Sequence, residues 1–122
     1  MKKSAKYNLE ERLINYSVLI IKIVGLMNTN RASNHLASQL VRSGTSPSLN
    51  YGEAQSAESR KDFIHKIKVI LKELRETMIC LKIIEQARFL KKTDLINNSI
   101  QETNELIAIF VTSVATASKH DK

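Results

Sequence analysis

The feature that most constrains the fold is the spacing of apolar residues between positions 59 and 91. They recur at steps of four, three, four, seven and three residues, at Phe63, Ile67, Ile70, Leu74, Leu81 and Ile84. Such steps return a side chain to the same side of an α-helix, which turns by about 100° per residue. The stretch is therefore predicted to form one long amphipathic helix whose apolar side packs against neighbouring helices.

The other side of this predicted helix is basic. Residues 60–92 contain ten basic and four acidic residues. Five of the cations fall within a single arc of roughly 80° around the helix axis. Together with Arg60 at the amino end they form a set that we name the basic stripe: Arg60, Lys61, Lys68, Lys72, Arg75 and Lys82. A one-sided concentration of positive charge favours contact with a polyanion such as RNA or DNA.

A face neutralised by its own carboxylates is the alternative for this stripe. Lys72 is followed by Glu76 four residues on, and helix pairs at this spacing attract each other. Lys82 is followed in the same way by Glu85, three residues on.

The stripe also lacks aromatic residues, since the tyrosines are Tyr7, Tyr16 and Tyr51. Proteins that hold single strands by stacking need aromatic platforms in the binding groove. We therefore expect any nucleic-acid contact to use phosphates, with a steep salt dependence and little base selectivity.

The rest of the chain fits an all-α protein of one domain. A chain of 122 residues with three glycines and one proline suits helices and gives little support to a sheet. Asn8 and Glu11 have the spacing of a capping box at the start of the first helix. We expect an antiparallel up-and-down four-helix bundle with helices at about 8–27, 31–55, 59–91 and 94–117.

The segment around Pro47 allows two interpretations. In one, the second helix ends at Gly44 and the third runs from Pro47 to residue 91, about 67 Å at 1.5 Å per residue. In the other, the second helix continues through a kink at Pro47 to about Gln55, and Ser59 caps the third helix. The second interpretation is preferred, because bundles bury their apolar faces best when helix lengths match.

Two apolar surfaces indicate self-assembly. The helix expected at 8–27 is apolar nearly all round and needs neighbours on more than one side. In the helix at 59–91, Ile79, Ile83 and Leu90 lie on or beside the arc of the basic stripe, where a monomer would leave them in contact with water. We expect these three residues to form a subunit interface in a homo-oligomer.

No sequence motif for catalysis, a cofactor or a metal is present. Cys80 is the single cysteine, and His35, His65 and His120 stand far apart without a partner motif. The Glu-x-x-His pair of di-iron bundles is missing. We therefore expect a non-enzymatic protein without cofactor or metal. The third possibility, an enzyme, would need an unexpected metal.

We expect a cytoplasmic protein that does not contact a membrane. The chain has no signal-type segment at its amino end. The apolar run Leu13–Met27 has about fifteen residues, fewer than the ~20 that span a bilayer.

From the Pro47 region through residue 77 the sequence resembles a known family. The matching runs are Gln39–Ser46, Asn50–Gln55, Ala57–Lys66 and Leu71–Thr77, which keep their order and spacing over roughly half the chain. They are similar to the four-helix-bundle proteins named for 23S rRNA intervening sequences.

The resemblance implies an antiparallel four-helix bundle that assembles as a ring-like homopentamer, with a role in nucleic-acid binding and no agreed catalytic residues. A related branch, the accessory variability determinant of diversity-generating retroelements, serves beside a reverse transcriptase. Cys80 stands where other members tend to have a Trp after the Arg-Glu-Thr block, which argues against an aromatic contact at that position.

Two functions follow as hypotheses. The first is a non-enzymatic, oligomeric bundle that binds RNA or DNA without base specificity through the basic stripe, repeated around a ring. The second is a protein-interaction scaffold or accessory subunit, for a partner such as a reverse transcriptase, without direct nucleic-acid contact. Its contact surfaces would be the apolar carboxyl half of the helix at 59–91 and the exposed side of the helix at 8–27.

Overall fold

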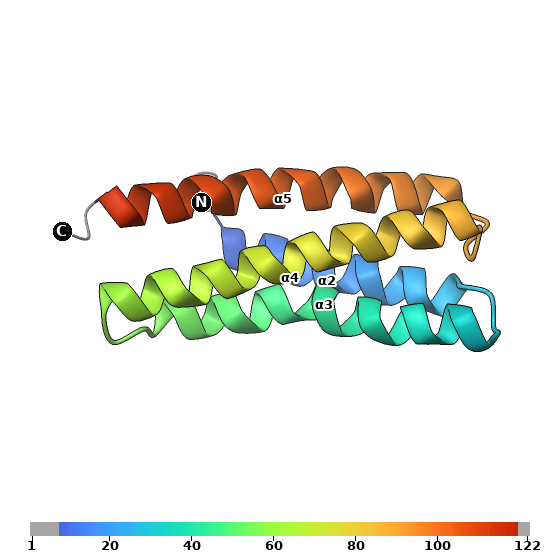
Figure 1. Cartoon of the computed structure of the whole chain (residues 1–122), viewed down its shortest axis with the longest axis horizontal. Helices are drawn as coiled ribbons and strands as arrows, with labels where there is room; N and C mark the ends of the chain where they lie inside the picture. Colours follow the sequence, from blue (N-terminus) through green and yellow to red (C-terminus); the bar gives the residue numbers. More distant parts are fainter. Residues whose placement is uncertain (1–7, 120–122) are drawn as a thin grey trace.

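Four helices make up nearly all of residues 8–119, which are the residues described by the structure, a computed structural model (Figure 1). The helices are α2 (Leu9–Leu26), α3 (Arg31–Gln55), α4 (Arg60–Ala87) and α5 (Thr93–Lys119). Each helix runs antiparallel to the one before it, and α4 lies between α3 and α5 in Figure 1. The predicted antiparallel four-helix bundle is thus confirmed, and residues 8–119 contain no strand.

The first three of these helices begin at polar caps. The side chain of Asn8 accepts a hydrogen bond from the Glu11 backbone N–H at 3.0 Å, as expected from the sequence. Asn30 accepts in the same way from the Ser33 N–H. Ser59 accepts from the Asp62 N–H at 3.0 Å. These side chains satisfy backbone donors that a helix start leaves without a partner.

Pro47 lies inside α3, and its side chain is buried. The second helix therefore continues to Gln55, as the preferred interpretation predicted, and α4 starts after a short reversal. Proline has no N–H to donate to the preceding turn. The hydroxyls on either side of it donate to carbonyls that precede the proline, Thr45 to Val41 at 2.7 Å and Ser48 to Thr45 at 3.0 Å.

The core is built around the apolar side of α4. All members of the predicted seam are buried except Phe63, which is half-buried and packs against the same core. Two hydroxyl pairs cross this core, Thr77 with Ser43 at 2.9 Å and Tyr16 with Thr103. One turn before Tyr16, Arg12 forms salt bridges with two carboxylates of α5 and so joins α2 to α5 at the surface.

The carboxyl end of α4 differs from the prediction. The helix was expected to reach Lys91, but it ends at Ala87 because Arg88 takes the left-handed conformation, with φ 60° and ψ 40°. The Arg88 N–H then donates to the Glu85 carbonyl at 3.2 Å, and the Phe89 N–H to the Ile84 carbonyl at 3.1 Å. This is the hydrogen-bond pattern of a Schellman motif. The two residues that follow, Lys91 and Lys92, consequently lie in the α4–α5 loop.

Candidate nucleic-acid interface

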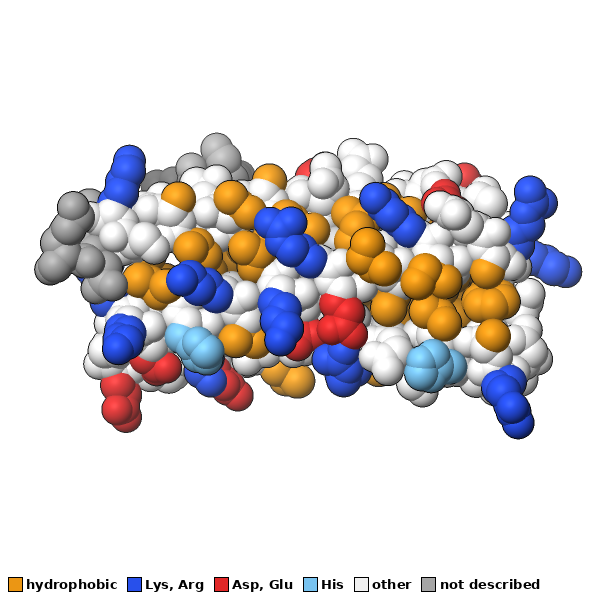
Figure 2. Space-filling view, viewed as in Figure 1, with side chains coloured by type: hydrophobic (Ala, Val, Ile, Leu, Met, Phe, Trp, Pro, Cys, Tyr) orange, Lys and Arg blue, Asp and Glu red, His pale blue; other side chains and the backbone are white. Residues whose placement is uncertain are grey.

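The basic stripe forms an exposed line of cations along α4. All six of its residues are exposed, from Arg60 at the first position of the helix to Lys82 near its carboxyl end. Lys61 and Lys82 are about 32 Å apart along the axis at 1.5 Å per residue. Figure 2 shows Lys and Arg side chains spread along the face that α4 presents, with hydrophobic side chains between them. The structure thus places the six predicted residues on one side of one helix.

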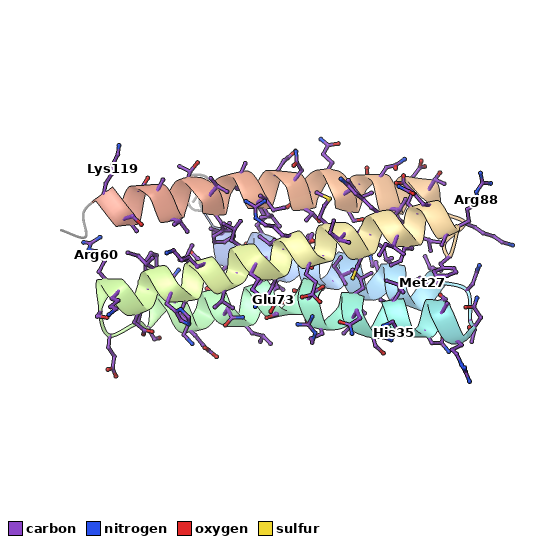
Figure 3. All side chains as sticks on the ribbon, viewed as in Figure 1. Met27, His35, Arg60, Glu73, Arg88 and Lys119 are labelled. Atoms are coloured by element: carbon purple, nitrogen blue, oxygen red, sulfur yellow. The ribbon has the colours of Figure 1, made fainter. Side chains whose placement is uncertain are left out.

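Arg42 of α3 determines how much of this charge is neutralised. Its guanidinium forms salt bridges with two carboxylates of α4, Glu73 at 3.1 Å and Glu76. The hydrogen bond that Arg42 donates to the Glu76 carboxylate is the largest of the effects that raise the pKa of Arg42. Figure 3 shows Glu73 on the side of α4 that faces α3. The two carboxylates are therefore held toward α3 and away from the stripe.

This arrangement argues against the alternative of a stripe that is neutralised by its own carboxylates. Glu76 pairs with Arg42 instead of Lys72, and within residues 8–119 no member of the basic stripe forms a salt bridge. Another cation of α4, Lys66, pairs with Glu53 of α3 at 2.6 Å, and this contact raises the pKa of Lys66. The carboxylates of Glu53, Glu73 and Glu76 at the α3–α4 contact thus form salt bridges with cations outside the stripe.

A surface depression lies at the amino end of the stripe. It has a volume of 280 Å³ and is lined by Lys61, Ile64, His65, Lys68 and Ser118. Two ammonium groups, an imidazole and a hydroxyl are groups that donate hydrogen bonds to phosphate oxygens. The depression could therefore hold a phosphate between α4 and the end of α5.

A second depression of 380 Å³ lies further along the groove between α4 and α5. Its lining combines cations with apolar and amide side chains: Arg75, Met78, Ile79, Lys82, Asn104 and Ile107. Two cations at the edge of an apolar surface can hold a phosphate chain while the apolar groups contact sugars or bases. The lining includes one residue, Ile79, that the sequence suggested for a subunit interface.

The three predicted interface residues are not equivalent. Ile79 is 57% exposed and Ile83 is 44% exposed, so both are available for an intermolecular contact. The expectation for Leu90 was wrong, because its side chain is only 6% exposed. Since α4 ends at Ala87, Leu90 is not on the outer side of a helix. Its side chain turns into the core and covers the end of the bundle.

Helix α2 carries a further exposed apolar surface. Ile14, Val18 and Ile21 are each about half exposed, at steps of four and three residues. This spacing places them on one side of the helix, opposite to Leu13, Tyr16, Ile20 and Ile23 in the core. The exposed side of α2 that the sequence indicated is thus present as a continuous row.

Metal-binding clusters and membrane-spanning helices are absent from the described residues. No group of three or more His, Cys, Asp or Glu side chains from residues 8–119 could hold a metal ion. Cys80 is buried, and desolvation raises the pKa of its thiol. No helix in this part of the chain is long and apolar enough to cross a membrane. His120 and Tyr7 lie outside the described residues.

Aromatic side chains are absent from the stripe, as predicted from the sequence. Tyr16 is buried and Tyr51 is half-buried, with its ring edge against Phe110 at a centroid distance of 6.1 Å. The role of Arg42 could not be predicted, because that residue is 34 positions from Glu76 in sequence. The loop position of Lys91 and Lys92 also differs from the helix that was predicted there. No local signal revealed either one.

Comparison with known proteins identifies the family. A family model described as 23S rRNA-intervening sequence protein matches residues 6–111. Among curated proteins none matches the chain. A solved structure with the same fold belongs to a protein with unknown function from the S23 ribosomal protein family of Bacteroides thetaiotaomicron. It is 24% identical, covers 86% of this chain and 96% of its own, and has a TM-score of 0.75. This chain belongs to the 23S rRNA-intervening sequence protein family.

Proposed function

We propose that this protein binds RNA or DNA without base specificity, through contacts between phosphates and the basic stripe. The observation that carries the proposal is the absence, within residues 8–119, of any salt bridge to the six exposed cations. Cations that already hold carboxylates would have to exchange one anion for another on binding. Unpaired cations release only counterions, which is the main source of non-specific affinity for nucleic acids.

The shape of the stripe favours a ligand with regularly placed phosphates. A helix is rigid, so the Cα atoms of the stripe keep their spacing along a line of about 32 Å, and only the long side chains can adjust to a ligand. A duplex presents phosphates on a comparably rigid frame, whereas a single strand is usually held by stacking on aromatic groups. Among residues 8–119 no Phe, Tyr or Trp side chain is exposed on this face. We therefore expect duplexes and structured RNA to bind more tightly than unstructured single strands.

Charge reversal at the centre of the stripe tests the proposal. Lys68→Glu combined with Lys72→Glu should lower the affinity for a fluorescein-labelled duplex by at least about tenfold at 100 mM salt. Fluorescence anisotropy gives the dissociation constant. The matched control is Lys22→Glu combined with Arg31→Glu, which changes the net charge equally at two exposed cations outside the stripe. Equal affinities for the two double variants would rule the proposal out.

The alternative function is a scaffold or accessory subunit that contacts only proteins. The row Ile14, Val18 and Ile21 on α2 and the exposed pair Ile79 and Ile83 on α4 favour it. Exposed apolar rows of this kind commonly mark subunit or partner contacts. We propose that these surfaces hold copies of the chain together, in line with the homopentamer that the family resemblance implies. A protein partner such as a reverse transcriptase would use the same surfaces.

The oligomeric state in solution tests the apolar surfaces of α2 and α4 independently of the basic stripe. Sedimentation equilibrium should give a multiple of the chain mass for the wild-type protein. Ile21→Glu and Ile79→Glu place a charge in the apolar rows and should each shift the mass toward a single chain. If the Lys68, Lys72 variant keeps full nucleic-acid affinity while these variants dissociate, the scaffold function is favoured over the first proposal.

A further inference from the structure

The α4–α5 loop brings three more cations to the end of the bundle. Arg88, Lys91 and Lys92 are all exposed. The salt bridges found between residues 8 and 119 involve none of them. Figure 3 shows Arg88 extending outward from the end of the molecule where α4 passes into α5. Lys91 and Lys92 follow the end of α4 at Ala87 and precede α5, whereas the sequence had predicted a helix as far as residue 91.

The loop is held in one conformation by the rest of the fold. The Asn28 backbone N–H, from the α2–α3 turn, donates to the Phe89 carbonyl at 2.8 Å. The Asn28 side-chain amide donates to the Arg88 carbonyl at 3.4 Å. Phe89 is half-buried and Leu90 is buried in the core. The cations thus extend from a fixed backbone, and ordering them on binding a ligand requires little loss of backbone entropy.

Arg88 occupies a position that usually belongs to glycine. It is the one non-glycine residue with a positive φ within residues 8–119. A side chain at φ 60° is disfavoured by contact of its Cβ with the backbone, and helices that end in this way mostly use Gly at the position. Replacing the arginine by glycine would relieve that strain. Residues held in sparsely populated backbone conformations cluster at catalytic and ligand-binding sites.

The loop cations lie beyond the carboxyl end of the basic stripe, at the end of the bundle. Arg88 is six residues beyond Lys82, which corresponds to about 9 Å along the helix axis. Two depressions, of 460 and 520 Å³, flank Lys91 on either side of the loop. Two carboxylates also border them, Glu85 in the first and Asp94 in the second. Four cations against these two carboxylates leave positions 82–94 with a net positive charge.

We propose that the α4–α5 loop is a second phosphate-binding site, in which Arg88, Lys91 and Lys92 contact the same nucleic acid as the basic stripe. The inference rests on the proposed function, since it extends the ligand past the end of α4. Arg88 is the central residue, because its guanidinium can hold a phosphate through two parallel hydrogen bonds. The site lengthens the contact from about 32 Å to about 41 Å along the axis.

Arg88→Gly tests the site, because strain and binding predict opposite effects. Thermal unfolding of the variant should occur at the same temperature as wild type or higher, since glycine suits the left-handed conformation. Its affinity for a labelled duplex should fall by about three- to tenfold, and the slope of log K against log salt should lose about one unit. Lys22→Ala, which removes an exposed lysine from α2, is the control and should change neither quantity.

A second variant removes charge from the loop without introducing a glycine. Lys91→Ala combined with Lys92→Ala leaves Arg88 and the backbone conformation in place and should lower the affinity by a similar factor. Wild-type affinity and slope in both loop variants would overturn the inference. If those two bind normally while Lys68→Glu with Lys72→Glu fails to bind, only the loop site is wrong. If wild-type protein itself does not bind the duplex, the proposed function fails and the loop site fails with it.

Discussion

The hydroxyl oxygen of Tyr16 lies 2.5 Å from the Oγ1 atom of Thr103 and joins α2 to α5 inside the core. The Thr103 hydroxyl donates its single hydrogen to the Ser99 carbonyl at 2.6 Å. Tyr16 must therefore be the donor in the pair, because a hydroxyl carries one hydrogen. Both side chains are buried, so no water can replace either partner. The contact fixes how α2 and α5 lie relative to each other.

Truncating the two partners should have unequal effects. Thr103→Val removes the acceptor and leaves the buried Tyr16 hydroxyl without a partner, which costs about 1–3 kcal/mol. Tyr16→Phe removes the donor, while Thr103 keeps its bond to Ser99, and should cost about 1 kcal/mol. Urea unfolding measures both free energies, with the slope against denaturant unchanged. A larger loss for Tyr16→Phe would contradict the donor assignment.

The Tyr16 phenol also predicts a loss of stability in alkali. Desolvation by burial raises the pKa of Tyr16 above the ordinary value of 10.0. Above pH 10 the unfolded chain therefore loses the phenolic proton while the folded chain keeps it. The free energy of unfolding should then fall by about 1.4 kcal/mol per pH unit from this residue, and only above pH 10. Urea unfolding from pH 9 to 11 should show a shallower decline in Tyr16→Phe. Parallel declines in the two proteins would contradict the assignment.

Gly44 determines how closely α2 and α3 approach. A Cβ atom at this position would meet the Cγ1 and Cγ2 atoms of Ile20 at 2.8 Å, and Ile20 is a β-branched side chain with little rotamer freedom. Gly44→Ala should therefore strain the contact between the helices. Gly52→Ala is the matched control, since it lies in the same helix with no atom within 4 Å of its added Cβ.

The two glycine variants should differ in sign. Gly52→Ala gains helix propensity and should raise the free energy of unfolding by about 0.5–1 kcal/mol. Gly44→Ala gains the same propensity but should be less stable than Gly52→Ala by about 1–3 kcal/mol, because of overpacking. Thermal or urea unfolding of both proteins gives the comparison. Equal stabilities would show that α2 can move away from α3 without loss.

Arg42 should affect nucleic-acid binding from outside the basic stripe. Arg42→Ala releases Glu73 and Glu76, and the two carboxylates would then repel phosphates beside Lys72. Affinity for a duplex should fall by a few-fold. The free energy of unfolding should fall by about 1–3 kcal/mol, because the Glu73 side chain is only 15% exposed and loses its cation. Removing the carboxylates as well, with Glu73→Gln and Glu76→Gln added, should restore the affinity. A loss that persists in the triple variant would mean that Arg42 itself contacts the ligand.

The helices and the side of α4 that faces the core could be predicted from local patterns. The spacing of Ile67, Ile70 and Leu74 indicates which face of the helix is buried. The caps at Asn8 and Ser59 are formed by side chains that bond to the backbone within one helical turn. Such features depend only on residues that are close together in the sequence, so they can be predicted without a structure. Matching helix lengths were enough to place Pro47 inside α3.

The features that could not be predicted depend on tertiary contacts or on an unusual backbone. The end of α4 was placed at residue 91 because its left-handed residue is Arg88, where a glycine would have marked the stop. The same error placed Leu90 on the surface. The pairing of Arg42 with Glu76 requires knowing how α3 and α4 lie side by side. A prediction from spacing alone selected Lys72 instead, which is the nearer cation along the helix.

The salt dependence of duplex binding tests the central claim most directly. If the six residues of the basic stripe each contact a phosphate, the stripe should contribute about −5 to the slope of log K against log salt for duplex DNA, and the three loop cations about −3 more. Lys68→Ala with Lys72→Ala should reduce the slope by about two units, while Lys22→Ala with Arg31→Ala should leave it unchanged. A slope that is the same in the stripe variant and in wild type would contradict the claim that phosphates bind along α4.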